Sequence, residues 1–151
     1  MATRVADRVM LDTNVLLAAT DEGRAEHKHA LEVANDWPRQ GTVLYVSGQI
    51  LREYLAVATR PTQMNGLGMT QADAVANARA FRARARFLSE DDKVSDRLLN
   101  LLDEIACGGK QTHDANVVAT MLVHGLEEIV TMNTGDFTRF GDHVRPIRLT
   151  G

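Results

Sequence analysis

Short apolar runs alternate with amphipathic segments along this chain, and no other feature of the sequence restricts the fold as strongly. The strands that we predict cover 9–11, 43–46, 128–131 and 145–149. The segments between them repeat apolar residues at every third or fourth position, which is the spacing of one helix face. Strands that alternate with helices in this way are typical of an α/β domain, so we predict a central, mostly parallel sheet flanked by helices.

Six helices are expected around these strands. The first begins near residue 15, and the others cover 26–37, 48–59, 71–88, 94–107 and 113–124. Four predicted helix starts are preceded by residues that can cap them, namely Thr13 or Asn14, Ser47, Thr70 and Thr112. Four predicted helix ends are followed by residues that stop a helix, namely Pro38, Pro61, Gly108 with Gly109, and Gly125. Pro146 is expected near the start of a final edge strand.

The length of 151 residues is that of one typical domain, so a single domain is expected over 1–151. No apolar run could span a bilayer, and the first eight residues carry charges of both signs, so we expect a cytoplasmic protein with no membrane partner. Cys107 is the single cysteine, which excludes an internal disulfide and a cysteine-only zinc site. His27 and His29 lie two positions apart, off a common helix face, and are expected to be solvated.

Four acidic residues stand at predicted strand ends or at adjoining helix starts, namely Asp12, Glu53, Asp114 and Asp136. Ligands of open parallel sheets collect beyond the carboxyl ends of the strands, so we expect these four side chains to lie together. Each has an ordinary explanation when taken alone, such as the favourable place of Asp114 in the first turn of a helix. Together they would repel one another unless a hard divalent cation lay among them, and oxygen ligands favour Mg²⁺ or Mn²⁺. Two such ions can activate a water and stabilise the departing oxygen in phosphodiester hydrolysis.

Four stretches resemble, in the same order, the successive motifs of the PIN domain. They are 11–17, 52–54, 114–116 and 131–137. The resemblance covers essentially the whole chain, and it implies a three-layer fold, with a parallel sheet between helices, and metal-dependent ribonuclease activity. Small single-domain members of the family are largely VapC-type toxins. The resemblance therefore also implies a VapB-like antitoxin and a homodimer.

The resemblance assigns roles to individual residues. The principal metal-binding acids of the family correspond here to Asp12, Glu53 and Asp114, and its supporting polar positions to Asn14 and Thr131. The fourth acid of the family often stands where this chain has Asn133. Either Asn133 or Asp136 takes that position, and a second metal depends on which of them does.

These inferences lead to the hypothesis of an Mg²⁺-dependent endoribonuclease in which no side chain acts as the nucleophile. The net charge of −3 argues mildly against a nucleic-acid ligand, unless metal ions neutralise the acids locally. The window 52–86 has the opposite balance, because its six arginines against two acids leave a local charge of +4. These arginines either contact RNA phosphates or form a solvated face, and they are Arg52, Arg60, Arg79, Arg82, Arg84 and Arg86.

Two other functions compete with this hypothesis. An aspartate-nucleophile phosphatase would use Asp12 as the nucleophile and a second aspartate two positions on as the general acid, but Asn14 stands there. A catalytically inactive domain that binds RNA or protein would share the fold, and substitution of its acids would leave its function unchanged. His113, beside Asp114, is expected to be a hydrogen-bonded neighbour rather than a base.

Overall fold

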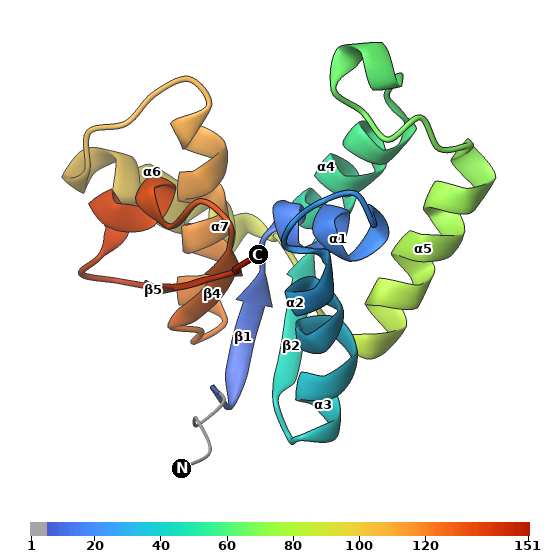
Figure 1. Ribbon diagram of the computed structural model, residues 1–151. Helices are drawn as coiled ribbons and strands as arrows, with labels where there is room; N and C mark the ends of the chain where they lie inside the picture. Colours follow the sequence, from blue (N-terminus) through green and yellow to red (C-terminus); the bar gives the residue numbers. More distant parts are fainter. Residues whose placement is uncertain (1–5) are drawn as a thin grey trace.

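The computed structural model describes residues 6–151, which form a five-stranded sheet between two groups of helices (Figure 1). The strands are β1 (Arg8–Leu11), β2 (Val43–Ser47), β3 (Arg86–Leu88), β4 (Glu128–Thr131) and β5 (Arg145–Arg148). Their order across the sheet is β3-β2-β1-β4-β5, and every neighbouring pair is parallel. The predicted α/β class with a parallel sheet is confirmed, and β5 is the expected edge strand.

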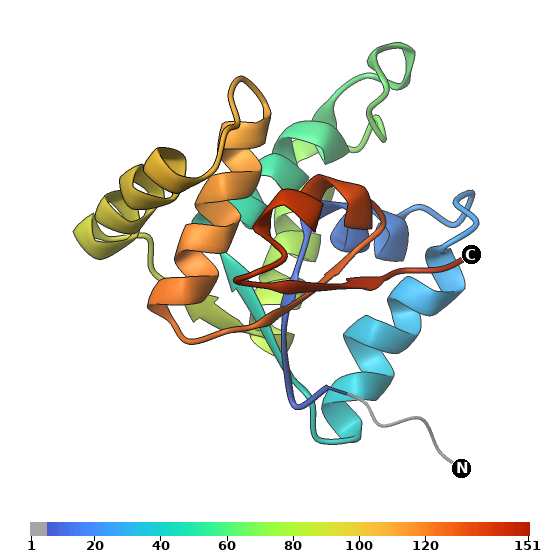
Figure 2. The same cartoon turned by 90° about the vertical axis from the view of Figure 1, so that its left-hand side faces the viewer.

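Helices cover both faces of the sheet. On one side lie α1 (Thr13–Thr20), α2 (His27–Leu31), α4 (Gly48–Thr59) and α5 (Gln71–Arg84), and on the other α6 (Asp92–Glu104) packs against α7 (Gln111–Val123) (Figures 1 and 2). The central strand β1 is therefore apolar on both faces, and Val9, Met10 and Leu11 are all buried. Among residues 6–151, no helix combines the length and the apolar character that crossing a membrane requires.

The direction in which strands are added to the sheet reverses between β1 and β4. From β1 the chain moves to β2 and β3 on one side, and it later returns to β4 and β5 on the other. Sheets of this kind bind ligands beyond the carboxyl ends of the strands that flank the reversal. Asp12 follows β1 directly, and its N–H donates to Val130 O at 3.0 Å.

The prediction of one helix over 71–88 is wrong at its carboxyl end. Helix α5 ends at Arg84, Ala85 is extended, and β3 follows. In β3, Arg86 and Phe87 pair with Tyr45 and Val46 of β2. The open edge of β2 supplies hydrogen-bond partners for this segment, and that tertiary contact outweighs the helical spacing of the apolar residues.

Pro38 does not stop the second predicted helix. After α2, a π-helical turn over Glu32–Asp36 leads into α3 (Trp37–Arg39), and Pro38 lies in the first turn of α3. Pro38 has no N–H to donate, and the π-helical turn directly before it already departs from the α-helical hydrogen-bond pattern that a proline would break. The helix therefore continues to Arg39, past the predicted end.

Several predicted helix boundaries are shifted. Ser47 and Thr70 cap α4 and α5 as predicted, and Gly125 follows α7 with a φ of +73°. In contrast, α1 is capped by Asp12 rather than by Thr13 or Asn14. Helix α6 covers Asp92–Glu104 instead of 94–107, and Gly108 and Gly109 lie in the loop after it. Thr112 lies within α7, which has no side-chain cap.

The two histidines of α2 are not simply solvated, contrary to expectation. His27 Nδ1 lies 2.7 Å from the carbonyl oxygen of Ala18, and His29 Nδ1 accepts a hydrogen bond from Thr150 N–H at 2.9 Å. The pair thus connects α2 to α1 and to the carboxyl-terminal segment.

Candidate active site

Asp12 lies at the carboxyl end of β1 and is held by three hydrogen bonds. Its Oδ1 accepts from Thr13 N–H at 2.8 Å. Its Oδ2 accepts from Thr131 Oγ1 at 2.8 Å and from Asn14 Nδ2 at 3.3 Å. These donors come from α1 and from the end of β4. The carboxylate therefore has a defined orientation at the reversal point of the sheet.

Glu53 reaches the same place from α4. Because Ser47 caps this helix directly after β2, Glu53 lies in its second turn. Thr13 Oγ1 donates to Glu53 Oε2 at 2.7 Å, and Gln49 Nε2 donates to Glu53 Oε1 at 2.9 Å. Thr13 binds Asp12 through its N–H and Glu53 through its hydroxyl. This buried threonine therefore joins two carboxylates that are far apart in the sequence.

Asp114 and Asp136 complete the group of acids. Asp114 lies in the first turn of α7, and Asp136 lies in the 3₁₀ helix Thr134–Phe140 after β4. The pKa of Asp114 is raised to about 6 by burial and then by the negative charges of Asp12, Asp136 and Glu53. Arg139, which was not among the sequence candidates, acts on this pKa in the opposite direction. The structure thus brings the four predicted acids into one electrostatic group.

The pKa of Asp12 reflects the same group. Burial is the largest cause that raises it, and the charges of Glu53 and Asp136 act in the same direction. The hydrogen bonds from Thr131 and from the N–H of Thr13 lower it. Each donor stabilises the ionised carboxylate.

Asn14 and Thr131 are hydrogen-bonded to Asp12 and to each other. Asn14 Oδ1 accepts from Met132 N–H at 3.0 Å, and Asn14 Nδ2 donates to Thr131 Oγ1 at 3.2 Å. Thr131 is fully buried, and its Oγ1 also accepts from Asn133 N–H at 3.1 Å. The side chain of Asn133 itself is exposed. An asparagine amide does not act as a general acid, so the phosphatase alternative gains no support.

Gln49 connects α4 to α7, and it was not among the residues singled out from the sequence. The side chain of Gln49 is 5% exposed, and its Nε2 also donates to His113 O at 2.9 Å. His113 directly precedes Asp114, so Gln49 holds the helix of Glu53 against the start of the helix of Asp114. One signal was available, because Gln49 stands one helical turn before Glu53 on the same face.

Asn116 and Glu90 extend this network. Asn116 Nδ2 donates to Gln49 Oε1 at 2.6 Å and to Glu90 Oε1 at 2.9 Å. The N–H of Gln49 donates to Glu90 Oε2 at 2.7 Å. Glu90 lies between β3 and α6 and was not among the sequence candidates. It is in fact an acceptor that anchors the amino end of α4.

The chemistry of the four acids fits a hard divalent cation, because carboxylate oxygens are the ligands that Mg²⁺ and Mn²⁺ prefer. Their mutual repulsion, expressed in the pKa of Asp114, is what such a cation would relieve. Within residues 6–151, no three side chains of histidine, cysteine, aspartate or glutamate are close enough to form a metal site. The four acids therefore act on one another electrostatically, but they do not lie close enough to form a complete set of metal ligands.

The structure distributes the arginine candidates over α4, α5, β3 and the turn after α4. All are exposed, and they are Arg52, Arg60, Arg79, Arg82, Arg84 and Arg86. The guanidinium of Arg82 lies 4.4 Å from the centre of the Phe87 ring, and that of Arg84 lies 5.9 Å from the Phe81 ring. Their contact with RNA stays a prediction.

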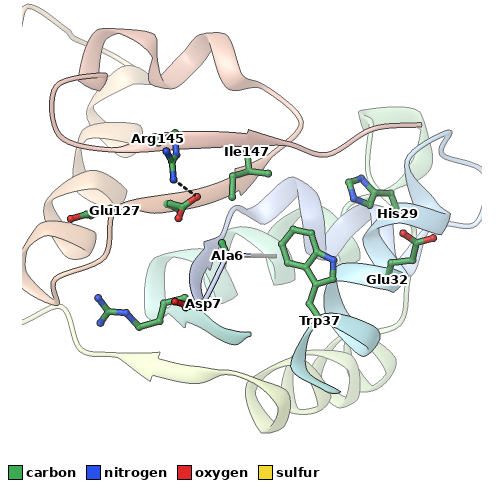
Figure 3. A pocket seen from close by; sticks show the side chains of 10 residues that line it. Ala6, Asp7, His29, Glu32, Trp37, Glu127, Arg145 and Ile147 are labelled. Atoms are coloured by element: carbon green, nitrogen blue, oxygen red, sulfur yellow. Dashed lines mark ion pairs between the residues drawn. The ribbon is translucent and has the colours of Figure 1, made fainter. Parts of the chain in front are cut away.

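A cavity of about 910 Å³ is lined by none of the four acids (Figure 3 shows its lining). Trp37 and Ile147 line it, and the ion pair between Arg145 and Glu128, with 3.0 Å between Nη2 and Oε2, forms part of its wall. Arg8 at the start of β1 also lines it. The cavity therefore opens at the amino ends of the strands, opposite the edge that carries the acids.

A comparison with protein families agrees with the placement of the four acids at the carboxyl ends of the strands. The sequence model of the PIN domain matches residues 9–142, a range that includes all four acids. The chain belongs to the PIN domain family. The comparison of this PIN domain with curated proteins gave no match.

Solved structures share the fold of this PIN domain over nearly its whole length. A chain of VapBC2 from Rickettsia felis, bound to a DNA fragment from their promoter, has a TM-score of 0.67 and 15% identity, covering 93% of this chain and 98% of that chain. VapC20 from Mycobacterium tuberculosis, described as a Sarcin-Ricin loop cleaving toxin, has a TM-score of 0.63 and 19% identity, covering 93% and 98%. A toxin-antitoxin complex from Klebsiella pneumoniae contains a chain with a TM-score of 0.57 and 25% identity, covering 86% and 90%.

The raised pKa of Asp114 predicts a stability that depends on pH. Asp114 titrates near 3.8 in the unfolded chain and near 6 in the folded PIN domain, so the folded state binds the proton more tightly between these values. Without metal, the contribution of Asp114 to stability therefore falls as pH rises from about 4 to about 6. Since the side chain is half-exposed, Asp114→Asn is expected to stabilise the protein at pH 7 by about 1 to 2 kcal/mol and to have little effect near pH 4.

Urea unfolding of both proteins in EDTA at the two pH values measures this difference. Asp103→Asn, at an exposed position of α6, is the matched control and should change neither value. A stabilisation of equal size at both pH values would contradict the argument.

Proposed function

We propose that this protein is a divalent-metal-dependent endoribonuclease and the toxin of a toxin-antitoxin pair. The observation that carries the proposal is the electrostatic group of Asp12, Glu53, Asp114 and Asp136 at the carboxyl edge of the sheet. The charges of Glu53 and Asp136 raise the pKa of both Asp12 and Asp114, and carboxylates placed in this way are costly to keep unless they serve a cation. The PIN fold and its toxin neighbours favour hydrolysis of a phosphodiester as the use of that cation.

Asp12, Glu53 and Asp114 would hold Mg²⁺ or Mn²⁺. We assign the fourth acidic position to Asp136 rather than to Asn133, because the charge of Asp136 acts on both Asp12 and Asp114. When bound, the cation supplies Lewis-acid stabilisation of the negative charge that develops on the phosphate.

The other residues of the site orient these acids. Thr131 and Asn14 bind one oxygen of Asp12, and Thr13 and Gln49 bind the two oxygens of Glu53. Side chains held by such bonds lose little further freedom when a ligand binds, which favours preorganised electrostatic stabilisation. No side chain of the group is proposed as the nucleophile.

RNA is the proposed substrate, and an antitoxin is the proposed protein partner. Support for RNA comes from the family and from the described activity of VapC20, a Sarcin-Ricin loop cleaving toxin. Support for an antitoxin comes from the VapBC complexes among the neighbours. A VapB-like antitoxin that inserts an arginine or an apolar helix would suit an edge rich in carboxylates. We also propose a homodimer, which light scattering of the purified protein would test.

The deciding experiment is incubation of the purified protein with total RNA, either with Mg²⁺ or with an excess of EDTA. We expect discrete RNA fragments with Mg²⁺ and intact RNA with EDTA, because the acids alone do not stabilise a developing negative charge. A protein that binds RNA under both conditions and cleaves it under neither would be the catalytically inactive module instead.

A further inference from the structure

An exposed aromatic ring lies among arginines at the outer edge of the sheet. Phe87 on the edge strand β3 is 42% exposed, although large apolar side chains are usually buried. The guanidinium of Arg82 lies over its ring, 4.4 Å from the ring centre. A Cβ atom placed on Gly48 would lie 3.1 Å from Arg52 Nη1, 3.4 Å from Glu90 Oε2 and 3.7 Å from Phe87 Cζ. Phe87, Arg82 and Arg52 therefore form one group, the Phe87 cluster, which meets the amino end of α4 at Gly48.

The Phe87 cluster adjoins the group of acids through α4. Gly48 is the first residue of this helix, and Arg52 directly precedes Glu53. Gln49 follows Gly48 in α4. Its side chain donates to Glu53, and its N–H donates to Glu90. The Phe87 cluster therefore lies at the amino end of the helix that carries Glu53.

The chemistry of the Phe87 cluster is that of a subsite for an unpaired base. An exposed aromatic face stacks on any nucleobase, and a neighbouring arginine contributes a cation–π contact or binds a phosphate. Arg82 and Arg52 give the cluster two cations beside one carboxylate, that of Glu90, so an anionic ligand is favoured there. A protein partner would instead favour a larger apolar surface than this single ring.

We propose that Phe87, with Arg82 and Arg52, stacks an unpaired RNA base next to the site of cleavage. This inference rests on the proposed ribonuclease function and adds one contact to it, a base stacked on Phe87. Bases in a duplex are already stacked on each other, so the subsite favours single-stranded or looped RNA. Arg82 stacks against the ring, and Arg52 provides a cation for the neighbouring phosphate.

The test is binding of a fluorescently labelled oligouridylate, measured by anisotropy in an Asp12→Asn background that prevents cleavage. Phe87→Leu is expected to weaken binding by about tenfold, because it removes the stacking surface and keeps an apolar side chain. Phe87→Tyr should bind within about twofold of the parent. The effect of Phe87→Leu should disappear with an oligomer of abasic ribose phosphates and with double-stranded RNA.

Leu99→Ala is the matched control, because Leu99 is 62% exposed but lies on α6, away from β3. It should leave binding unchanged. Thermal melting of each variant checks that the fold is retained. Equal binding by the parent and Phe87→Leu, or an equal loss with the abasic oligomer, would overturn the stacking subsite. The ribonuclease proposal is tested separately, by whether the wild type cleaves RNA with Mg²⁺ at all.

Discussion

Replacement of Asp12 by asparagine is expected to reduce RNA cleavage by about a thousandfold or more. Asp12 stands at the reversal point of the sheet, and it belongs to the group of carboxylates proposed to hold the cation. Loss of a metal ligand removes several kcal/mol of transition-state stabilisation, and about 4 kcal/mol corresponds to a thousandfold in rate. Cleavage of total RNA with Mg²⁺, followed over time for both proteins, measures the effect.

The same substitution is expected to leave the fold intact. The asparagine oxygen can still accept the hydrogen bond from the N–H of Thr13, and the cost of a buried negative charge is gone. In EDTA, the melting temperature of Asp12→Asn should therefore equal or exceed that of the wild type. Asp103→Asn, on the exposed side of α6, serves as the control with full activity. Full activity of Asp12→Asn would show that Asp12 does not belong to the active site. A large loss of stability would indicate a structural role for Asp12.

Addition of Mg²⁺ is expected to stabilise the protein, and removal of Mg²⁺ to abolish cleavage. A ligand at about a hundred times its dissociation constant stabilises a protein by about 2.7 kcal/mol if the unfolded chain does not bind it. For a chain of this size that corresponds to a rise of about 5 to 10 °C in melting temperature. Relief of the repulsion that raises the pKa of Asp114 is the physical source of this gain.

Variants of the acids show whether the stabilisation comes from the proposed site. Asp12→Asn should lose most of the rise in melting temperature. Asp136→Asn should reduce it and Asn133→Ala should not, if Asp136 is the fourth acid. A rise of the same size in Asp12→Asn would place the cation elsewhere, and no rise in the wild type would contradict a metal held by these acids.

Much of this architecture could be predicted from local sequence. Strands buried on both faces must be apolar throughout, so β1, β2 and β4 stand out as continuous runs. An acid that directly follows such a strand, or lies in the first two turns of the next helix, is positioned by that strand or helix. For that reason Asp12, Glu53, Asp114 and Asp136 could be assigned to one edge of a parallel sheet before any coordinates were known.

Tertiary structure decided the parts that depend on contacts between distant segments. Residues 86–88 continue a helical pattern in the sequence, and they form a strand because β2 leaves an edge open for pairing. Likewise, Thr13 and Gln49 resemble an ordinary cap and an ordinary helix residue until the folded chain brings Glu53 and His113 within hydrogen-bond distance. Such partners are invisible in a single sequence, because a hydrogen bond between remote residues depends on their distance in space and leaves no periodicity along the chain.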